Sequence, residues 1–364
     1  MSEDKDTSYN SKKPSHNPLA PSDPGGKVIK FKKKKPLTLE NYVNGISNGD
    51  RVILSQAITK IESTIKADIE LSQKIIDNCL PLTGNSIRIG ITGVPGVGKS
   101  TFIEALGNYI IENSGQKVAV LAIDPTSQKS KGSILGDKTR MEKLSQNPYA
   151  FIRPSASGGS IGGVAKKTRE AIFLCEAAGF NTIIVETVGV GQSETSVNSM
   201  VDFFLLLLLA GAGDELQGIK RGVMEMADCV AITKADGENK QMAEIAKKQY
   251  ENALKLYPVK ENGWVAKVIK CSSITMEGIS DIWETVQNHH NRMNDTGYLD
   301  RKRQDQSILW MHETIISELK DSFYNNSRIK NIILELEDRV KTGEISPFKA
   351  ANKLLDIYFS LNPD

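Results

Sequence analysis

The sequence predicts an α/β fold built on a mostly parallel sheet that helices cover on both faces. Three observations predict it. From residue 86 onward, short apolar runs alternate with amphipathic helical runs, which is typical of parallel strands joined by helices. The run Phe203–Leu209 is apolar throughout, as expected of a strand buried on both faces. A glycine-rich loop, residues 93–100, separates a strand pattern from a helical pattern.

The N-terminal part is predicted to hold a tail and then helices. Residues 1–36 are rich in Ser, Lys, Pro, Asp and Asn and end in a basic run, so we expect a disordered tail. A tail that contacts a partner or an acidic surface is the alternative. Acidic residues near its start argue against an organelle transit peptide. Helical periodicity over 38–80 predicts that 37–85 is an N-terminal helical segment.

Seven runs between residues 86 and 290 are predicted strands of one nucleotide-binding domain. They are 87–92, 118–123, 150–153, 182–186, 203–209, 229–233 and 265–270. The first run alternates apolar with small or polar residues, as a strand that feeds a loop does. Ligands of parallel sheets collect beyond the carboxyl ends of the strands, so polar residues that follow these runs are candidates for the site.

The pattern changes after residue 290 to charged helices with apolar positions at helical spacing. We expect 291–364 to be a C-terminal helical arm used for dimerisation. Helices that pack on their own domain are the alternative.

Composition narrows the class of protein. A net charge of +2 over 364 residues predicts no nucleic-acid partner. The longest apolar run is far shorter than the ~20 residues of a membrane-spanning helix, so no membrane span is expected. The four cysteines are scattered and form no C-x-x-C pair. This pattern predicts packing cysteines in a reduced, cytoplasmic protein rather than a structural zinc site.

The glycine-rich loop matches the phosphate-loop pattern G-x-x-x-x-G-K-[ST], since Gly93–Ser100 reads G-V-P-G-V-G-K-S. Glycines allow successive backbone N–H groups to point at a phosphate chain, and the helix that follows favours an anion at its N-terminus. The sequence therefore predicts a P-loop NTPase. The expected nucleotide-binding residues of the loop are Gly93, Val94, Pro95, Gly96, Val97, Gly98, Lys99, Ser100 and Thr101. Lys99 would reach the β- and γ-phosphates, and the Ser100 hydroxyl would bind Mg²⁺.

Acidic residues stand at or near the ends of three predicted strands. They are Asp124, Glu186 and Asp236. A carboxylate at the end of a buried strand needs a metal, a ligand or a hydrogen-bonded cap to compensate its charge. Helix capping is the alternative for each acid taken singly.

The segment Glu186-Thr-Val-Gly189 resembles the D-x-x-G element of GTPases, with Glu in place of Asp. Such a carboxylate holds Mg²⁺ directly or through water, and the Gly189 N–H meets a γ-phosphate.

Thr233-Lys234-Ala-Asp236 resembles the N-K-x-D guanine element, with Thr in place of the usual Asn. In that element the Asp accepts the N1 and N2 hydrogens of guanine, and adenine presents a different edge. Cys271-Ser-Ser273 resembles the last guanine loop, in which a backbone N–H meets O6, so Ser272 and Ser273 are predicted to bind the base.

Several longer stretches together resemble one family, the methylmalonyl-CoA mutase-associated GTPases of the MeaB/ArgK group. The stretches are 93–100, 121–127, 132–141, 153–157, 185–194 and 211–220. The resemblance covers roughly residues 40–364 and is most specific over 90–236.

This resemblance implies a homodimeric, cytoplasmic G protein that binds GTP or GDP with Mg²⁺ and acts on an adenosylcobalamin-dependent methylmalonyl-CoA mutase. Its GTP cycle would gate delivery of adenosylcobalamin from a cobalamin adenosyltransferase, and would protect or reactivate the mutase.

The resemblance also implies roles for single residues. The catalytic set would be Lys99, Asp124, Glu186, Asp214 and Lys220, and the metal set Ser100, Asp137 and Glu186. Residues 213–220 match a switch segment that engages the nucleotide when a partner orders it. Gln192 lies three residues after Gly189 instead of one, so we do not assign it the water-positioning role of small GTPases.

Three other functions stay open from the sequence. An ATP-dependent kinase or transport ATPase is one, although Asp236 argues for guanine. A metal-inserting chaperone GTPase is the second, although the motifs hold no cluster of cysteine or histidine ligands. The third is a scaffold that binds nucleotide without hydrolysis.

Overall fold

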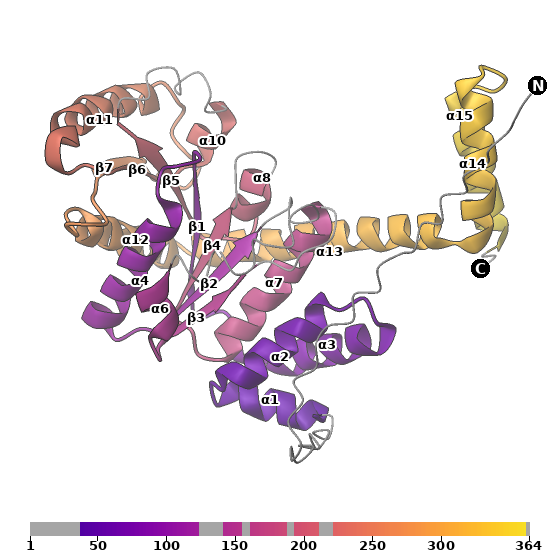
Figure 1. Ribbon diagram of the computed structural model, residues 1–364, viewed down its shortest axis with the longest axis horizontal. Helices are drawn as coiled ribbons and strands as arrows, with labels where there is room; N and C mark the ends of the chain where they lie inside the picture. Colours follow the sequence, from indigo (N-terminus) through magenta and orange to yellow (C-terminus); the bar gives the residue numbers. More distant parts are fainter. Residues whose placement is uncertain (1–36, 124–140, 155–160, 188–192, 211–220, 362–364) are drawn as a thin grey trace, which may run out of the picture. The chain divides into compact units, whose positions relative to one another are not determined.

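The fold is organised around a seven-stranded sheet (Figure 1). The computed structural model describes residues 37–123, 141–154, 161–187, 193–210 and 221–361. The strands are β1 (Ile87–Gly93), β2 (Val118–Ile123), β3 (Ala150–Arg153), β4 (Thr182–Thr187), β5 (Phe203–Leu209), β6 (Cys229–Thr233) and β7 (Lys267–Lys270). Their order is β3-β2-β4-β1-β5-β6-β7 and each pairing is parallel. The predicted fold class is confirmed.

Three details differ from the sequence prediction. Strands β1 and β4 each run one residue further, to Gly93 and Thr187. Strand β7 begins at Lys267 rather than at residue 265, because Lys267 pairs with the first residue of β6, Cys229. Strand β1 is buried from Arg88 to Gly93.

One face of the sheet is covered by α4 (Lys99–Ser114), α6 (Glu142–Gln146) and α12 (Ile279–Asp295) (Figure 1). The apolar side chains of α4 that the sequence places at helical spacing pack here with the odd-numbered residues of β1, Ile89 and Ile91, and with Trp283 of α12. This layer forms the main core and fixes the start of α4 at the carboxyl edge of the sheet.

The other face is covered by α7 (Ile161–Ala177) and α8 (Ser193–Asn198), which contact β4 and either β2 or β1. Helix α8 lies so close to β1 that a Cβ on Gly90 would stand 2.7 Å from Val197. Two further helices, α10 (Arg221–Met226) and α11 (Lys240–Leu254), contact strands β5 to β7, and η2 (Gly237–Asn239) precedes α11.

The N-terminal helices are α1 (Leu39–Ser47), α2 (Arg51–Glu62) and α3 (Lys66–Cys79), followed by η1 (Leu80–Leu82). Thr38 begins α1 with a capping box, and the Asp50 carboxylate accepts from the first free N–H groups of α2. All three helices contact α7. They therefore extend the helical layer on that face of the sheet.

The C-terminal helices are α13 (Tyr298–Asn325), α14 (Ser327–Lys341) and α15 (Pro347–Leu361). Helices α14 and α15 pack on each other through a small apolar cluster centred on Ile329 and Leu336. Helix α13 packs on α7 through an ion pair of 2.5 Å between Arg169 and Glu313 and an edge-to-face contact between Phe173 and Trp310. Among the described residues, no helix is both long and apolar enough to cross a membrane.

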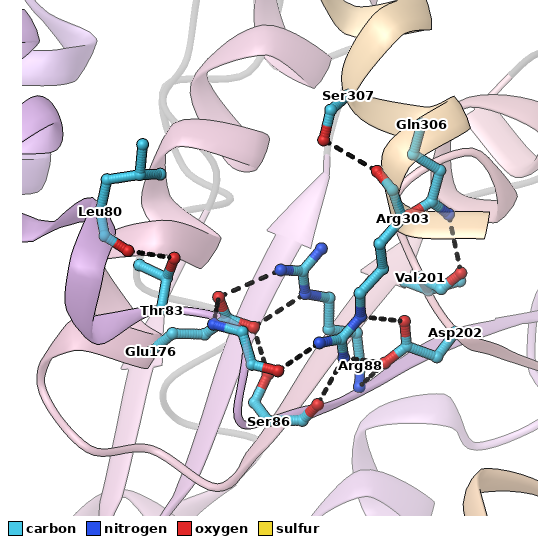
Figure 2. Close-up of polar contacts among 11 residues, drawn as sticks. Leu80, Thr83, Ser86, Arg88, Glu176, Val201, Asp202, Arg303, Gln306 and Ser307 are labelled. Atoms are coloured by element: carbon cyan, nitrogen blue, oxygen red, sulfur yellow. Dashed lines mark hydrogen bonds and ion pairs between the residues drawn. The ribbon is translucent and has the colours of Figure 1, made fainter. Parts of the chain in front are cut away.

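A buried ionic network joins the start of β1 to α7 (Figure 2). Arg88 of β1 is 3% exposed and donates from Nε and Nη2 to both carboxylate oxygens of Glu176, at 2.9 and 3.0 Å. The same carboxylate accepts from the Ser86 hydroxyl and from the Gly84 N–H. Its acceptor sites are thus met by four donors, which is the condition for a buried ion pair to be tolerated.

The network continues to α13 through Asp202, the residue before β5 (Figure 2). Its carboxylate accepts from the Arg88 backbone N–H at 2.9 Å and from Arg303 Nη2 at 2.6 Å. Burial opposes ionisation of Asp202, but the hydrogen bond and charge of Arg303, with Arg88, hold its pKa below the usual 3.8. Arg303 also donates to the Gly84 and Ser86 carbonyls. One side chain of α13 therefore fixes the start of β1 and of β5.

Replacing Arg88 with Met is expected to lower the free energy of unfolding by about 3–5 kcal/mol, because Glu176 would stay buried without its partner. Urea unfolding followed by circular dichroism measures this. The control is Lys341→Met, which removes the exposed ion pair with Asp338 at the end of α14. Equal midpoints for the two variants would show that the buried network does not stabilise the fold.

Candidate nucleotide-binding site

The phosphate loop leaves β1 at Gly93 and enters α4 at Lys99. Gly96 and Gly98 have φ angles of +80° and +89°, a backbone region that glycine adopts without strain. Gly98 accepts from the Phe102 N–H at 2.9 Å, which closes the first turn of α4. The first N–H groups of a helix have no partner within the helix, and α4 begins at the carboxyl end of β1, as a phosphate site requires.

Gly93 is glycine because of its neighbour strand. A Cβ on this residue would lie 2.5 Å from the backbone oxygen of Leu207 in β5, a distance that real Cβ atoms do not adopt. The loop therefore begins where Gly93 of β1 pairs with Leu207 of β5, and its position is tied to both strands.

Lys99, the first residue of α4, is bonded back to the start of the phosphate loop. Its ammonium donates to the Gly93 carbonyl at 2.9 Å. Burial lowers the pKa of Lys99 below 10.5, and the charges of Glu186 and Glu194 oppose that shift. A bound γ-phosphate would raise the pKa of Lys99 again, since it adds negative charge next to a partly desolvated cation. The geometry suits the phosphate-binding role predicted for Lys99.

Glu186 lies in β4 beside Ile91 of β1 and is 4% exposed. The next residues of the two strands, Thr92 and Thr187, share a hydrogen bond of 2.9 Å between their hydroxyls. Together with Ser100 in the first turn of α4, this edge offers carboxylate and hydroxyl oxygens. Oxygen donors of this kind are what Mg²⁺ prefers, so the donor set fits the metal.

The predicted guanine element, residues 233–236, is called the base loop below. It begins at the last residue of β6 and is bound to the phosphate loop by two side chains. The Thr233 hydroxyl donates to the Val97 carbonyl at 2.9 Å. Lys234 Nζ donates to the Gly96 carbonyl at 2.8 Å. Lys234 has a φ of +54°, unusual for a residue other than glycine. This turn directs the lysine over the phosphate loop, and Asp236 follows two residues later.

Ser272 fixes the Asp236 carboxylate. The Ser272 hydroxyl oxygen accepts from the Ile274 and Thr275 N–H groups at 3.2 and 3.1 Å. Its only proton therefore points to Asp236 Oδ2, with which it forms a short hydrogen bond. One oxygen of Asp236 is held by this bond, and the carboxylate keeps acceptor capacity for a ligand. The neighbouring Ser273 is half-buried.

The structure thus brings together the phosphate loop, Glu186, Thr233 to Asp236 and Ser272 at one edge of the sheet. Five predicted residues lie outside the described part of the chain: Asp124, Asp137, Gly189, Asp214 and Lys220. Their roles stay predictions. Ser100 is half-buried and Thr101 exposed, both in the first turn of α4.

Sequence reasoning gave no role to three polar residues of this edge. Glu194 in α8 is 3% exposed and adds to the negative charge that Lys99 meets. The sequence feature that points to Glu194 is an acidic residue that follows the D-x-x-G-like element and stands at the start of a helix. Thr92 and Thr187 had a weaker signal, as polar residues that end two buried strands.

Comparison with known sequences points to one family. The family profile described as "Methylmalonyl Co-A mutase-associated GTPase MeaB" matches residues 54–328. A probable GTPase of Mycobacterium tuberculosis is 46% identical over 320 residues, which cover 88% of this chain and 95% of that protein. The protein named GTPase ArgK of Escherichia coli is 43% identical over 310 residues, covering 85% and 93%.

A mouse protein and a solved structure are also similar. The mouse protein, named "Methylmalonic aciduria type A homolog, mitochondrial", is 42% identical over 337 residues, covering 90% of this chain and 81% of that protein. A crystal structure titled "LAO/AO transport system kinase" superposes with a TM-score of 0.70 at 36% identity, covering 88% of this chain and 97% of that one.

Gly93→Ala is expected to abolish detectable GDP binding, because the added Cβ would push β1 away from Leu207 or displace the phosphate loop. Isothermal calorimetry with GDP measures it. Gly162→Ala in α7 is the matched control, since nothing lies within 4 Å of its added Cβ. The control should bind GDP like the unchanged chain, and GDP binding by Gly93→Ala would refute the close approach.

Proposed function

The chain belongs to the family of methylmalonyl-CoA mutase-associated GTPases, and from this membership we propose that its GTP cycle serves an adenosylcobalamin-dependent methylmalonyl-CoA mutase. GTP hydrolysis is the activity of the family, and the phosphate loop with the half-buried Lys99 is the observation that supports it here. In this proposal the protein gates delivery of adenosylcobalamin to the mutase and protects or reactivates it. A cobalamin adenosyltransferase is the proposed source of the cofactor, and the cytoplasm the proposed location.

Guanine selectivity is proposed to rest on Asp236. A carboxylate accepts two parallel N–H groups, which guanine offers at N1 and N2. Ser272 supports this role because its proton holds one oxygen of Asp236 in place. The Ser272 and Ser273 backbone would meet the O6 edge.

Catalysis is proposed to depend on positioning and charge rather than on a general base. Lys99 would bind the phosphate oxygens that gain charge during transfer. Mg²⁺, when bound, would neutralise phosphate charge and would be held by Ser100 and Glu186, with Asp137 as a further candidate ligand. Asp124, Asp214 and Lys220 remain proposed members of the catalytic set, the last two when a partner orders their segment.

We also propose that the chain forms a homodimer through 291–364. Helix α13 carries large apolar side chains that are 43–65% exposed and recur at helical spacing: Ile308, Leu309, Met311, Ile315, Ile316 and Leu319. Helix α15 adds Phe348 and Phe359. An apolar stripe of this kind favours association with a second helical surface. The other proposed parts are the tail 1–36, the helical segment 37–85 and the GTPase domain 86–290.

A kinase or ATPase is the second candidate, because the similar crystal structure carries the word kinase in its title. Adenine offers one donor, the N6 amine, beside an acceptor, N1, so it cannot donate two parallel N–H groups to a carboxylate, and Asp236 favours guanine. ATP is therefore the control nucleotide of the main experiment.

The main experiment measures phosphate release from GTP and from ATP, with and without methylmalonyl-CoA mutase. We expect turnover of GTP and not of ATP, raised by at least about tenfold by the mutase. Lys99→Met should abolish turnover, and Lys74→Met on the exposed side of α3 should not. Turnover that is equal with and without the mutase would contradict the proposed partner and leave the GTPase intact.

The dimer is tested by analytical ultracentrifugation. The unchanged chain should sediment with twice the mass of one chain, and Ile316→Glu combined with Leu319→Glu should sediment as a monomer, because charges would enter the apolar stripe. Leu256→Glu, on an exposed residue of the loop after α11, is the control. A monomeric unchanged chain would refute the proposal.

A further inference from the structure

Thr233 stands where the guanine element usually has Asn, and its side chain is hydrogen-bonded within the protein. It is 2% exposed and stands at the end of β6. Its hydroxyl oxygen lies 2.9 Å from the Val97 carbonyl and 3.2 Å from the Leu208 carbonyl. The hydroxyl carries one proton. Both neighbours are acceptors, so that proton is engaged by the protein itself, chiefly by the shorter contact to Val97.

We propose that Thr233 is a positioning residue that ties the base loop to the phosphate loop, and that this site reads guanine without a donor to N7 from position 233. The second part rests on the proposed recognition of guanine by Asp236. It narrows the specificity of that site to the edge of the base that carries N1, N2 and O6.

The reason lies in the number of protons that each side chain offers. An Asn amide has two N–H protons. It can give one to a backbone carbonyl such as that of Val97 and still present the other to an acceptor on the base. Threonine offers one proton, and in this structure the phosphate loop takes it. N7 of guanine is an acceptor, so a base bound beside Thr233 receives no hydrogen bond from it.

A second contact supports the tether. Lys234, the next residue, donates to the Gly96 carbonyl in the same loop. The base loop is thus joined to the carbonyls of two successive residues of the phosphate loop, Gly96 and Val97. A nucleotide that spans both loops meets them at a fixed separation, which favours binding by preorganisation.

The test uses the full chain and calorimetry with GDP and 7-deaza-GDP, in which a C–H replaces N7. The unchanged chain should bind the two within about twofold of each other, since no hydrogen bond is lost. Thr233→Asn should prefer GDP by about fivefold, because it supplies the missing proton. Weaker binding of 7-deaza-GDP by tenfold or more to the unchanged chain, or no preference in Thr233→Asn, would overturn the N7 inference.

The tether has its own variants. Thr233→Val keeps the shape and removes the hydroxyl, so it should weaken GDP and 7-deaza-GDP in parallel by about tenfold. Thr233→Ser should restore binding to within about threefold, because it returns the proton. If Thr233→Val and Thr233→Ser have equal melting temperatures, recovery of binding by serine shows that the hydroxyl acts on nucleotide binding and not on folding. Binding by Thr233→Val equal to that of the unchanged chain would overturn the tether.

Inosine diphosphate separates this inference from the proposed function. It lacks the N2 amine that Asp236 is proposed to bind, so it should bind at least about tenfold more weakly than GDP. Equal binding of the two would count against Asp236. The 7-deaza comparison would still decide the question at Thr233, because it depends on N7 alone.

Discussion

The fold depends on the buried ionic network at the start of β1. Arg88 and Glu176 join this strand to α7, and Asp202 and Arg303 join the same point to β5 and α13. Two arginines and two carboxylates balance in charge, and most of their hydrogen-bonding groups have partners. Because the strands are parallel, fixing the start of β1 and β5 also fixes where they end. The close approach of Gly93 to Leu207 at the opposite ends is a consequence of that register.

Hydrogen bonds from side chains also order the phosphate loop. Backbone carbonyls of the phosphate loop accept from Lys99, Thr233 and Lys234, so side chains of the helix that follows the loop and of the base loop order this glycine-rich segment. Gly96 and Gly98 have positive φ angles, which in loops of this kind allow successive N–H groups to point at an anion. The flexible composition of the loop thus serves a single conformation.

The sequence predicts the layers of this fold well because each strand is a separate apolar run, and the phosphate loop because its residues are contiguous. It predicts less where contacts join distant residues. The ion pair of Arg88 is one example, because its partner Glu176 is 88 residues further along the chain, in α7. The bond between Thr233 and Val97 could not be read from spacing, since it depends on how close two strands bring their loops.

The arrangement keeps two sets of charges apart along one strand. Arg88 and Gly93 are five residues apart in β1, which spans about 16 Å in an extended strand, while the Debye length at physiological ionic strength is about 8 Å. Arg88 is 3% exposed, so salt that screens the more open phosphate site screens the buried ion pair much less. A change of charge at the phosphate site therefore takes place about 16 Å along β1 from the ion pairs that hold the start of this strand.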